Sequence, residues 1–101
     1  MAERSVRLHP EAERDLEEGL RFYLSRSAIA AEGFLAEVEA ALALLQEAPE
    51  RWPRFHHGTR RFVMAAYPYS IVYRSVADEI HVMAVAHAKR LPLYWRQRRM
   101  R

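Results

Sequence analysis

Residues 80–87 read IHVMAVAH and continue directly into residues 88–96, which read AKRLPLYWR. The side chains of the first run alternate as far as His87, a pattern typical of a β-strand. Two cations, a proline and a Tyr-Trp pair follow the histidine at once. The stretch therefore predicts a strand whose end places an imidazole, a guanidinium, an ammonium and a phenol at one edge of a small sheet.

Three more strands are predicted outside this stretch. Residues 60–65 alternate between two faces, and residues 69–76 are rich in β-branched and aromatic side chains. The connections at residues 66–68 and 77–79 are short enough for consecutive hairpins. Residues 5–8 alternate as well, which predicts a short first strand that pairs within the same sheet.

Two amphipathic helices are predicted between the first strand and the hairpins. The first covers about residues 10–25 and has acids in its early turns, where negative charge suits the helix dipole: Glu11, Glu13 and Asp15. The second covers roughly residues 28–47 and ends before Pro49. The short break between them favours an antiparallel helical hairpin.

This order of elements is typical of an α+β fold. We expect one domain over residues 1–101, in which the helical hairpin packs on one face of a small antiparallel sheet. In the last strand, the side chains expected to face the helices are Ile80, Val82, Ala84 and Ala86. The alternate side chains, including His87, are expected on the opposite face, which is predicted to be open and to carry function. Residues 93–101 are expected to form a short basic helix or to remain loose.

Charge divides the chain into two unequal halves. Residues 1–50 contain 5 arginines and 11 acids, a net charge of −6, whereas residues 51–101 contain 11 cations and 2 acids, a net charge of +9. All the cations except Lys89 are arginine, whose guanidinium group binds phosphate bidentately and stacks on bases. The asymmetry predicts that one face meets an anion. The arginine bias suits nucleic acid, or reflects a genome that favours arginine.

The sequence disfavours several kinds of site and location. The chain contains no cysteine, which excludes disulfides and thiolate metal sites and fits a cytoplasmic protein. The histidines lack carboxylates at ligand spacing and the glycines are scattered, so we expect no metal, no phosphate loop and no cofactor. Neither the apolar core of a signal peptide nor a stretch long enough to cross a membrane is found.

The groups near the end of the last strand permit RNA cleavage without a metal. In that chemistry a base takes the proton of the ribose 2′-hydroxyl, cations stabilise the phosphorane, and an acid protonates the leaving oxygen. His87 fits the base or the acid because imidazole titrates near neutral pH. The residues expected to gather there are Arg61, Arg74, His87, Arg90 and Tyr94. A structural role stays open, since a lone histidine at a strand end and a Tyr-Trp pair after a proline more often serve packing.

Four motifs follow one another along the chain. They are PEAERDL at residues 10–16, RRF at 60–62, YPYSIVYR at 67–74 and VAHAKRLPLYW at 85–95. In this order and at this chain length, they resemble the RelE/ParE toxins of bacterial type II toxin–antitoxin systems. The resemblance implies a strand–helix–helix–three-strand toxin and a small cognate antitoxin whose C-terminal segment wraps it. A homodimer and a toxin–antitoxin hetero-oligomer both fit that picture.

The resemblance leaves the mechanism open. RelE-like members are ribosome-dependent mRNA endonucleases, and carrying their pattern over assigns catalysis to Arg61, Arg74, His87, Arg90 and Tyr94. ParE-like members inhibit DNA gyrase without enzymatic activity, and the His-x-x-Arg-x-Pro-x-Tyr-Trp ending at residues 87–95 is common among them. Nucleic acid or a partner is expected to contact Arg60, Lys89, Trp95 and Arg96. Messenger-RNA cleavage is the first hypothesis, gyrase inhibition is the second, and an inactive toxin that still binds its antitoxin is the third.

Overall fold

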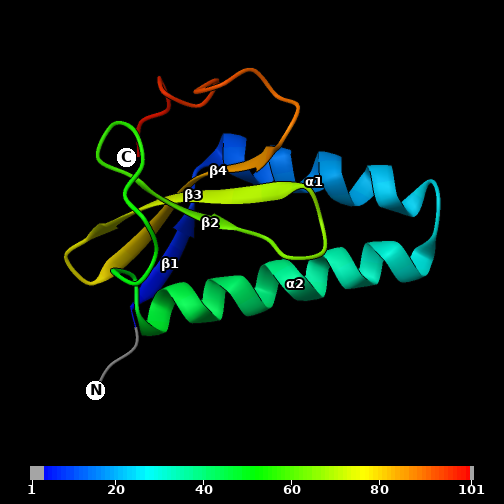
Figure 1. Ribbon diagram of the computed structural model, residues 1–101, viewed down its shortest axis with the longest axis horizontal. Coiled ribbons are helices and arrows are strands. Elements are labelled where there is room, and N and C mark those ends of the chain that lie inside the picture. The colour runs from blue at the N-terminus through cyan, green and yellow to red at the C-terminus, as the bar shows by residue number, and fades with distance from the viewer. Residues whose placement is uncertain (1–3, 101) are drawn as a thin grey trace.

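The computed structural model describes residues 4–100, so that residues 1–3 and 101 of the predicted domain lie outside the described residues. The elements follow one another as β1 (Ser5–Leu8), α1 (Pro10–Leu24), α2 (Ala28–Glu47), β2 (Arg60–Val63), β3 (Tyr69–Val76) and β4 (Glu79–His87). The two helices lie side by side as a hairpin against the sheet (Figure 1). The predicted α+β class and the order of its elements are confirmed.

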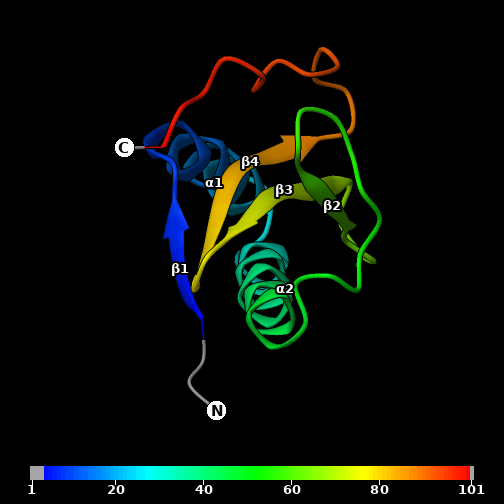
Figure 2. The ribbon, with the colours of Figure 1, turned by 90° about the vertical axis from the view of Figure 1, so that its left-hand side faces the viewer.

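The four strands form one sheet in the order β1-β4-β3-β2. β2, β3 and β4 pair antiparallel, as the hairpins predict, whereas β1 runs parallel to β4. The sheet is therefore mixed and not wholly antiparallel as expected, because the chain between β1 and β4 supplies the long connection that a parallel pair requires. Figure 2 shows β1 at one edge beside β4 and β2 at the other.

Both helices begin close to where the sequence predicts. His9 precedes α1 and its Nδ1 accepts the backbone N–H of Glu11 at 3.0 Å, while Pro10 takes the first helical position. Ser27 caps α2 by accepting the N–H of Ala30 at 3.2 Å. Among residues 4–100, no helix is both long enough and apolar enough to span a membrane.

The main core lies between the helical hairpin and one face of the sheet. Its buried side chains include Phe34, Val38, Leu45, Ile71, Tyr73, Ile80 and Val82. Gly19 allows α1 to approach these layers closely, because a Cβ there would lie 2.9 Å from Phe34 Cζ and 3.0 Å from Tyr69 Oη. A glycine in the middle of this helix is thus explained by packing, although glycine is a weak helix former.

A β-bulge changes which side chains of β4 face the helices. Val72 pairs with Ala84 and Tyr73 pairs with Val82, so that Met83 is an extra residue on β4. One extra residue reverses the alternation beyond it. The predicted helix-facing positions are correct for Ile80 and Val82, which join the main core. They are wrong for the following alanines, Ala84 and Ala86, which lie on the other face.

The C-terminal segment, defined here as residues 88–100, folds back over that other face of the sheet. It contains turns but no helix or strand, so the short helix considered for residues 93–101 is not formed in the described part. Trp95 is only 3% exposed and packs with Val72 and Ala84, with Phe55 beside them. Figure 2 shows the segment crossing the sheet on the side away from α2. The face predicted to be open is therefore partly covered by the chain's own C-terminal segment.

Candidate partner-binding face

Two of the predicted arginines project from the sheet face that the C-terminal segment partly covers, which we call the open face. Arg61 lies on β2 and is exposed, with its guanidinium carbon 4.5 Å from the centroid of the Phe55 ring. Arg74 lies on β3, and its Nη2 donates to the carbonyl oxygen of His57 at 2.9 Å. Arg61 thus presents its charge to an incoming anion, whereas Arg74 is tied to the loop before β2.

His87 lies on the opposite side of the sheet, facing α1. Its ring meets the Tyr69 ring edge to face, with 4.9 Å between the centroids. Its Nδ1 accepts the backbone N–H of Lys89 at 3.0 Å, which assigns the proton of the neutral ring to Nε2. A small hollow that Glu18 helps to line lies beside it. The imidazole therefore packs on the core edge and holds the turn after β4.

Asp15 of α1 joins the C-terminal segment to the sheet. Its side chain is 4% exposed, and it forms an ion pair with Arg98. The carboxylate accepts four hydrogen bonds: from the N–H of Val85 at 3.1 Å, from the hydroxyl of Tyr94 at 2.9 Å, and from the two Nη atoms of Arg98 at 2.7 and 3.2 Å. An Nη atom of Arg90 lies 3.9 Å from the same carboxylate. Helix α1, strand β4 and the C-terminal segment therefore meet at one buried charge.

Tyr94 is enclosed by the same group of side chains. The guanidinium carbons of Arg90 and Arg98 lie 3.9 and 4.9 Å from the centroid of its ring. Burial, and then the neighbouring Asp15 carboxylate, raise the pKa of the Tyr94 phenol well above its ordinary value. A phenol that donates to a carboxylate and resists ionisation is a poor proton acceptor at neutral pH.

The residues predicted to contact nucleic acid or a partner have different environments. Arg60 is half-buried, and its Nη1 donates to the carbonyl oxygen of Trp52 at 2.7 Å. Trp95 is buried and is not available at the surface. Lys89 and Arg96 are exposed. Of this group, only the last two present charge to solvent.

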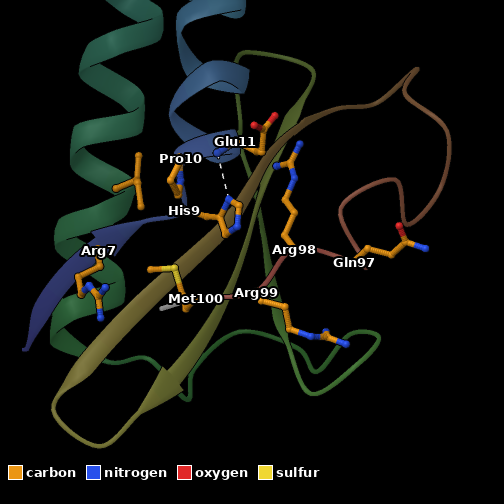
Figure 3. A pocket seen from close by; sticks show the side chains of 9 residues that line it. Arg7, His9, Pro10, Glu11, Gln97, Arg98, Arg99 and Met100 are labelled. Carbon is orange, nitrogen blue, oxygen red and sulfur yellow. Dashed lines mark hydrogen bonds between the residues drawn. The ribbon is translucent and has the colours of Figure 1, made fainter.

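Two of the hollows that the C-terminal segment helps to line lie at opposite parts of that segment. One, of about 280 Å³, lies on the open face with Arg61 and Arg90 in its lining. The other, of about 670 Å³, lies where the end of the segment passes the junction of β1 and α1. Figure 3 shows the second hollow, with Arg98 on one side and the capping imidazole of His9 on the other. Because Arg98 is paired with Asp15 and His9 caps α1, two of the polar side chains that line the second hollow already serve the fold.

The structure offers no assembled metal site in the part of the chain that it describes. Within residues 4–100, no group of three or more histidine or acidic side chains is placed to hold a metal ion. His56 and His57 are exposed in a loop, whereas His81 and His87 are hydrogen-bonded.

Comparison with known proteins identifies the family behind this arrangement. A family model described as the ParE toxin of the type II toxin–antitoxin system parDE matches residues 6–92. The chain belongs to the ParE toxin family. The resemblance to RelE/ParE toxins that the four sequence motifs indicated is thereby confirmed.

A solved structure shares the fold of this ParE-family chain. A chain of the "Chromosomal ParDE TA system from P. aeruginosa" superposes with a TM-score of 0.74 at 18% sequence identity, covering 85% of this chain and 97% of that one. At this identity the likeness establishes the fold alone. No curated protein matches the chain.

Of the five residues predicted as a catalytic group, Arg61, Arg90 and Tyr94 line one hollow of this ParE-family chain, whereas Arg74 and His87 do not line it. Arg61 and Arg74 project from the open face, while Arg90 and Tyr94 belong to the C-terminal segment and contact each other. His87 faces α1, so its predicted position beside the arginines of the open face is wrong. The cause is the bulge in β4, which reverses the alternation before the histidine is reached.

Asp15 is the residue that sequence reasoning missed. Its place in the early turns of α1 indicated only an acid suited to the helix dipole, but the residue is 5% exposed. A signal was present, because Asp15 follows buried Ala12 by three residues and precedes buried Gly19 by four. An acid at that spacing lies on the buried side of a helix, where a charge needs a partner. The identity of the partner, Arg98, could not be read from the spacing.

Proposed function

We propose that this ParE-family chain is a toxin that arrests growth by binding a protein, DNA gyrase, and not by cleaving RNA. The observation that most directly supports this proposal is that the groups an RNA-cleaving site would need are engaged elsewhere in the fold. Tyr94 donates to Asp15, Arg74 donates to the carbonyl of His57, and His87 faces α1. Gyrase inhibition, the second hypothesis from sequence, therefore becomes the first.

Proton transfer is the step for which this structure is least suited. General acid–base catalysis needs each group within about 3 Å of the proton it moves. Tyr94 already donates its proton to Asp15, and the raised pKa of its phenol disfavours the ionised form. His87 lines a hollow together with Glu18 and Arg90, so a phosphate approaching the imidazole would meet a carboxylate as well as a guanidinium group. These observations support a toxin without nuclease activity.

Base stacking is also disfavoured on this surface. RNA-binding sites that recognise unpaired bases expose aromatic faces on which the bases stack. Here Arg61 lies over the Phe55 ring, Arg90 and Arg98 lie over the Tyr94 ring, and Trp95 is buried. The aromatic rings of the open face are therefore already in contact with the protein's own cations or core, which supports a protein target.

The proposal includes a cognate antitoxin as the second protein partner. The net charge of +9 over residues 51–101 suits an acidic antitoxin segment, because opposite charge accelerates association and stabilises the encounter. A toxin–antitoxin hetero-oligomer would then cover the open face until the antitoxin is lost. Gyrase and the antitoxin are both cytoplasmic partners, so we place the toxin in the cytoplasm.

The proposed target is tested by a supercoiling assay with purified gyrase and by pulse labelling after induced expression. We expect the purified chain to inhibit supercoiling, and thymidine incorporation to fall before methionine incorporation. Methionine incorporation that falls first, with gyrase unaffected by excess protein, would contradict the proposal and restore mRNA cleavage. Growth that continues unchanged would support the inactive toxin.

A His87→Asn variant separates the two mechanisms within one chain. An asparagine oxygen can accept the N–H two residues ahead, as the imidazole Nδ1 does for Lys89, but it cannot transfer protons near neutral pH. We expect the variant to fold and to keep its toxicity within about twofold of the parent chain, because His87 has only a structural role under the proposal. A folded variant that has lost its toxicity would favour RNA cleavage.

A further inference from the structure

The 280 Å³ hollow on the open face, which we call the Arg61–Arg90 pocket, has no assigned ligand. Val72 of β3 and Ala86 of β4 line it from the sheet, and Pro92 lines it from the C-terminal segment. Its volume lies just below the range for ligand pockets, about 300–1,000 Å³, so it suits one side chain better than a whole small molecule.

The charge of the pocket has one sign. Among the residues that the structure describes, Arg61 and Arg90 are its charged lining residues and no carboxylate lines it. The two acids of residues 51–101, Asp78 and Glu79, lie at the turn between β3 and β4. That turn is at the far end of both strands from Ala86, so these acids do not neutralise the pocket. A ligand of this pocket therefore binds more tightly if it supplies carboxylates.

Both arginines can bind a carboxylate without giving up a strong contact. Arg61 is exposed, and its guanidinium rests on the Phe55 ring. The Arg90 side chain is 46% exposed, and its 3.9 Å contact with Asp15 is long because Arg98 already makes the close ion pair with that acid. Guanidinium groups bind carboxylates with two parallel hydrogen bonds when their tips are accessible.

Exposed apolar side chains adjoin the same arginines. Leu91 lines the pocket and is 78% exposed, and Val63, two residues after Arg61 on β2, is 62% exposed. Alternation along β2 places Val63 on the same face as Arg61. Large apolar side chains beside accessible guanidinium groups suit a protein partner, whose apolar contacts can cover them.

We propose that the Arg61–Arg90 pocket binds an acidic segment of a protein partner, inserting one aliphatic side chain between the two arginines and pairing flanking carboxylates with them. The inference rests on the proposed function, in which the toxin acts by contact with protein. A nucleic acid is the alternative occupant for a cationic pocket, but Arg61 and Arg90 already lie over the two aromatic rings that a base would need, those of Phe55 and Tyr94.

The test uses the full purified chain and two capped pentapeptides, Glu-Asp-Leu-Glu-Asp and the same peptide with serine in place of leucine. Binding is measured by calorimetry and by amide chemical shifts at Val72 and Ala86. We expect Arg61→Glu to weaken binding of the leucine peptide about tenfold or more, because it replaces an attractive charge with a repulsive one. The serine peptide should bind the parent chain about tenfold more weakly, since it lacks the buried aliphatic group.

Arg26→Glu is the matched control. Arg26 is also exposed, and its guanidinium carbon lies 4.3 Å from the centroid of the Phe22 ring, but it is in the connection between the two helices. The variant makes the same change in net charge and removes the same kind of ring contact. We expect its affinity for the leucine peptide to stay within about twofold of the parent, because exposed charges farther apart than the Debye length are screened.

Three results would overturn the inference. The first is that the parent chain and Arg61→Glu bind the leucine peptide with equal affinity, and the second is that the parent chain binds the two peptides with equal affinity. The third is that a short oligouridine shifts the amides of Val72 and Ala86 while the leucine peptide does not. The comparison of peptides uses only the parent chain, so it stays decisive even if Arg61→Glu does not fold. Because no gyrase and no cells are involved, absence of peptide binding is distinguishable from failure of the proposed target.

Discussion

Asp15 accepts four hydrogen bonds from three residues, Val85, Tyr94 and Arg98, which belong to β4 and the C-terminal segment. A buried carboxylate is costly unless it is paired and hydrogen-bonded, and here both conditions are met. A variant that removes only the charge of Asp15 should therefore be strongly affected. Its charged partner, Arg98, is itself mostly buried, with a 12% exposed side chain, and would be left without a counter-ion.

We expect Asp15→Asn to lower the free energy of unfolding by about 2–3 kcal/mol. The asparagine can still accept one or two of the four hydrogen bonds, but it leaves the Arg98 charge without its counter-ion. Urea denaturation measures the loss. Glu17→Gln is the control, because Glu17 lies on the exposed side of the same helix and should change stability by less than about 0.5 kcal/mol. Equal effects of the two variants would contradict a structural role for Asp15.

Tyr94 should make stability decline at alkaline pH. Because burial and the Asp15 carboxylate raise the pKa of its phenol in the folded chain, the unfolded chain loses that proton first, near the ordinary tyrosine value of about 10. The stabilisation is complete below that pH and is lost as the pH rises further. In Tyr94→Phe, the free energy of unfolding should fall less steeply above pH 10, by at most about 1.4 kcal/mol per pH unit. Parallel curves for parent and variant throughout would show that the phenol is not perturbed.

The bulge in β4 shows why an element could be predicted while the orientation of its side chains could not. The strand was expected at residues 80–87 and is found at Glu79–His87. Met83, Ala84 and Val85 are consecutive, apolar and buried, so the sequence gives no mark of the residue at which alternation reverses. Val85 is buried in the main core, whereas Ala84 is buried because Trp95 covers the second face of the sheet, a contact that lies beyond the strand itself. Local periodicity cannot reveal a phase change inside such a run.

The turn between β3 and β4 offers a test at the scale of an element. Ala77 has a φ of 53°, in the left-handed region that costs an L-residue about 1–2 kcal/mol and costs glycine nothing. We expect Ala77→Gly to raise the free energy of unfolding by about 0.5–1 kcal/mol, after allowing for the added freedom of the unfolded chain. Ala40→Gly, on the exposed side of α2, is the control and should lower it by about 1 kcal/mol. Losses of similar size at both positions would argue against strain at Ala77.

The whole molecule is a two-layer α+β unit closed by a segment that sequence reasoning could not place. The helical hairpin and the strands follow from periodicity, caps and prolines, all of which act over a few residues. The docking of residues 88–100 depends instead on Trp95 reaching Val72 and on Arg98 reaching Asp15, 83 residues earlier in the chain. Contacts at that separation leave no local pattern, so the covering of this face by the C-terminal segment could not be predicted.

The C-terminal segment should open independently of the rest of the fold. Its backbone N–H groups at Tyr94, Arg96 and Arg98 bond to carbonyls only three residues earlier, so they hold the segment to itself and not to the sheet. Beyond Ala88, whose N–H donates to the carbonyl oxygen of Pro68 at 2.8 Å, its attachment depends on a few side chains, and such regions open at lower free energy than the strands beneath them. Native-state hydrogen exchange measures both free energies in one sample.

We expect these three amides to exchange by a partial opening that leaves α2 and β3 protected. Asp15→Asn should lower the free energy of that opening, because it removes the main charged contact of the segment with α1. Glu17→Gln should leave it unchanged. If the amides of the segment and those of β3 exchanged at the same free energy in the parent chain, the segment would belong to the global folding unit, and its coverage of the open face would be permanent. A separate opening would mean that the Arg61–Arg90 pocket, one wall of which is the segment itself, can adjust to the partner that it binds.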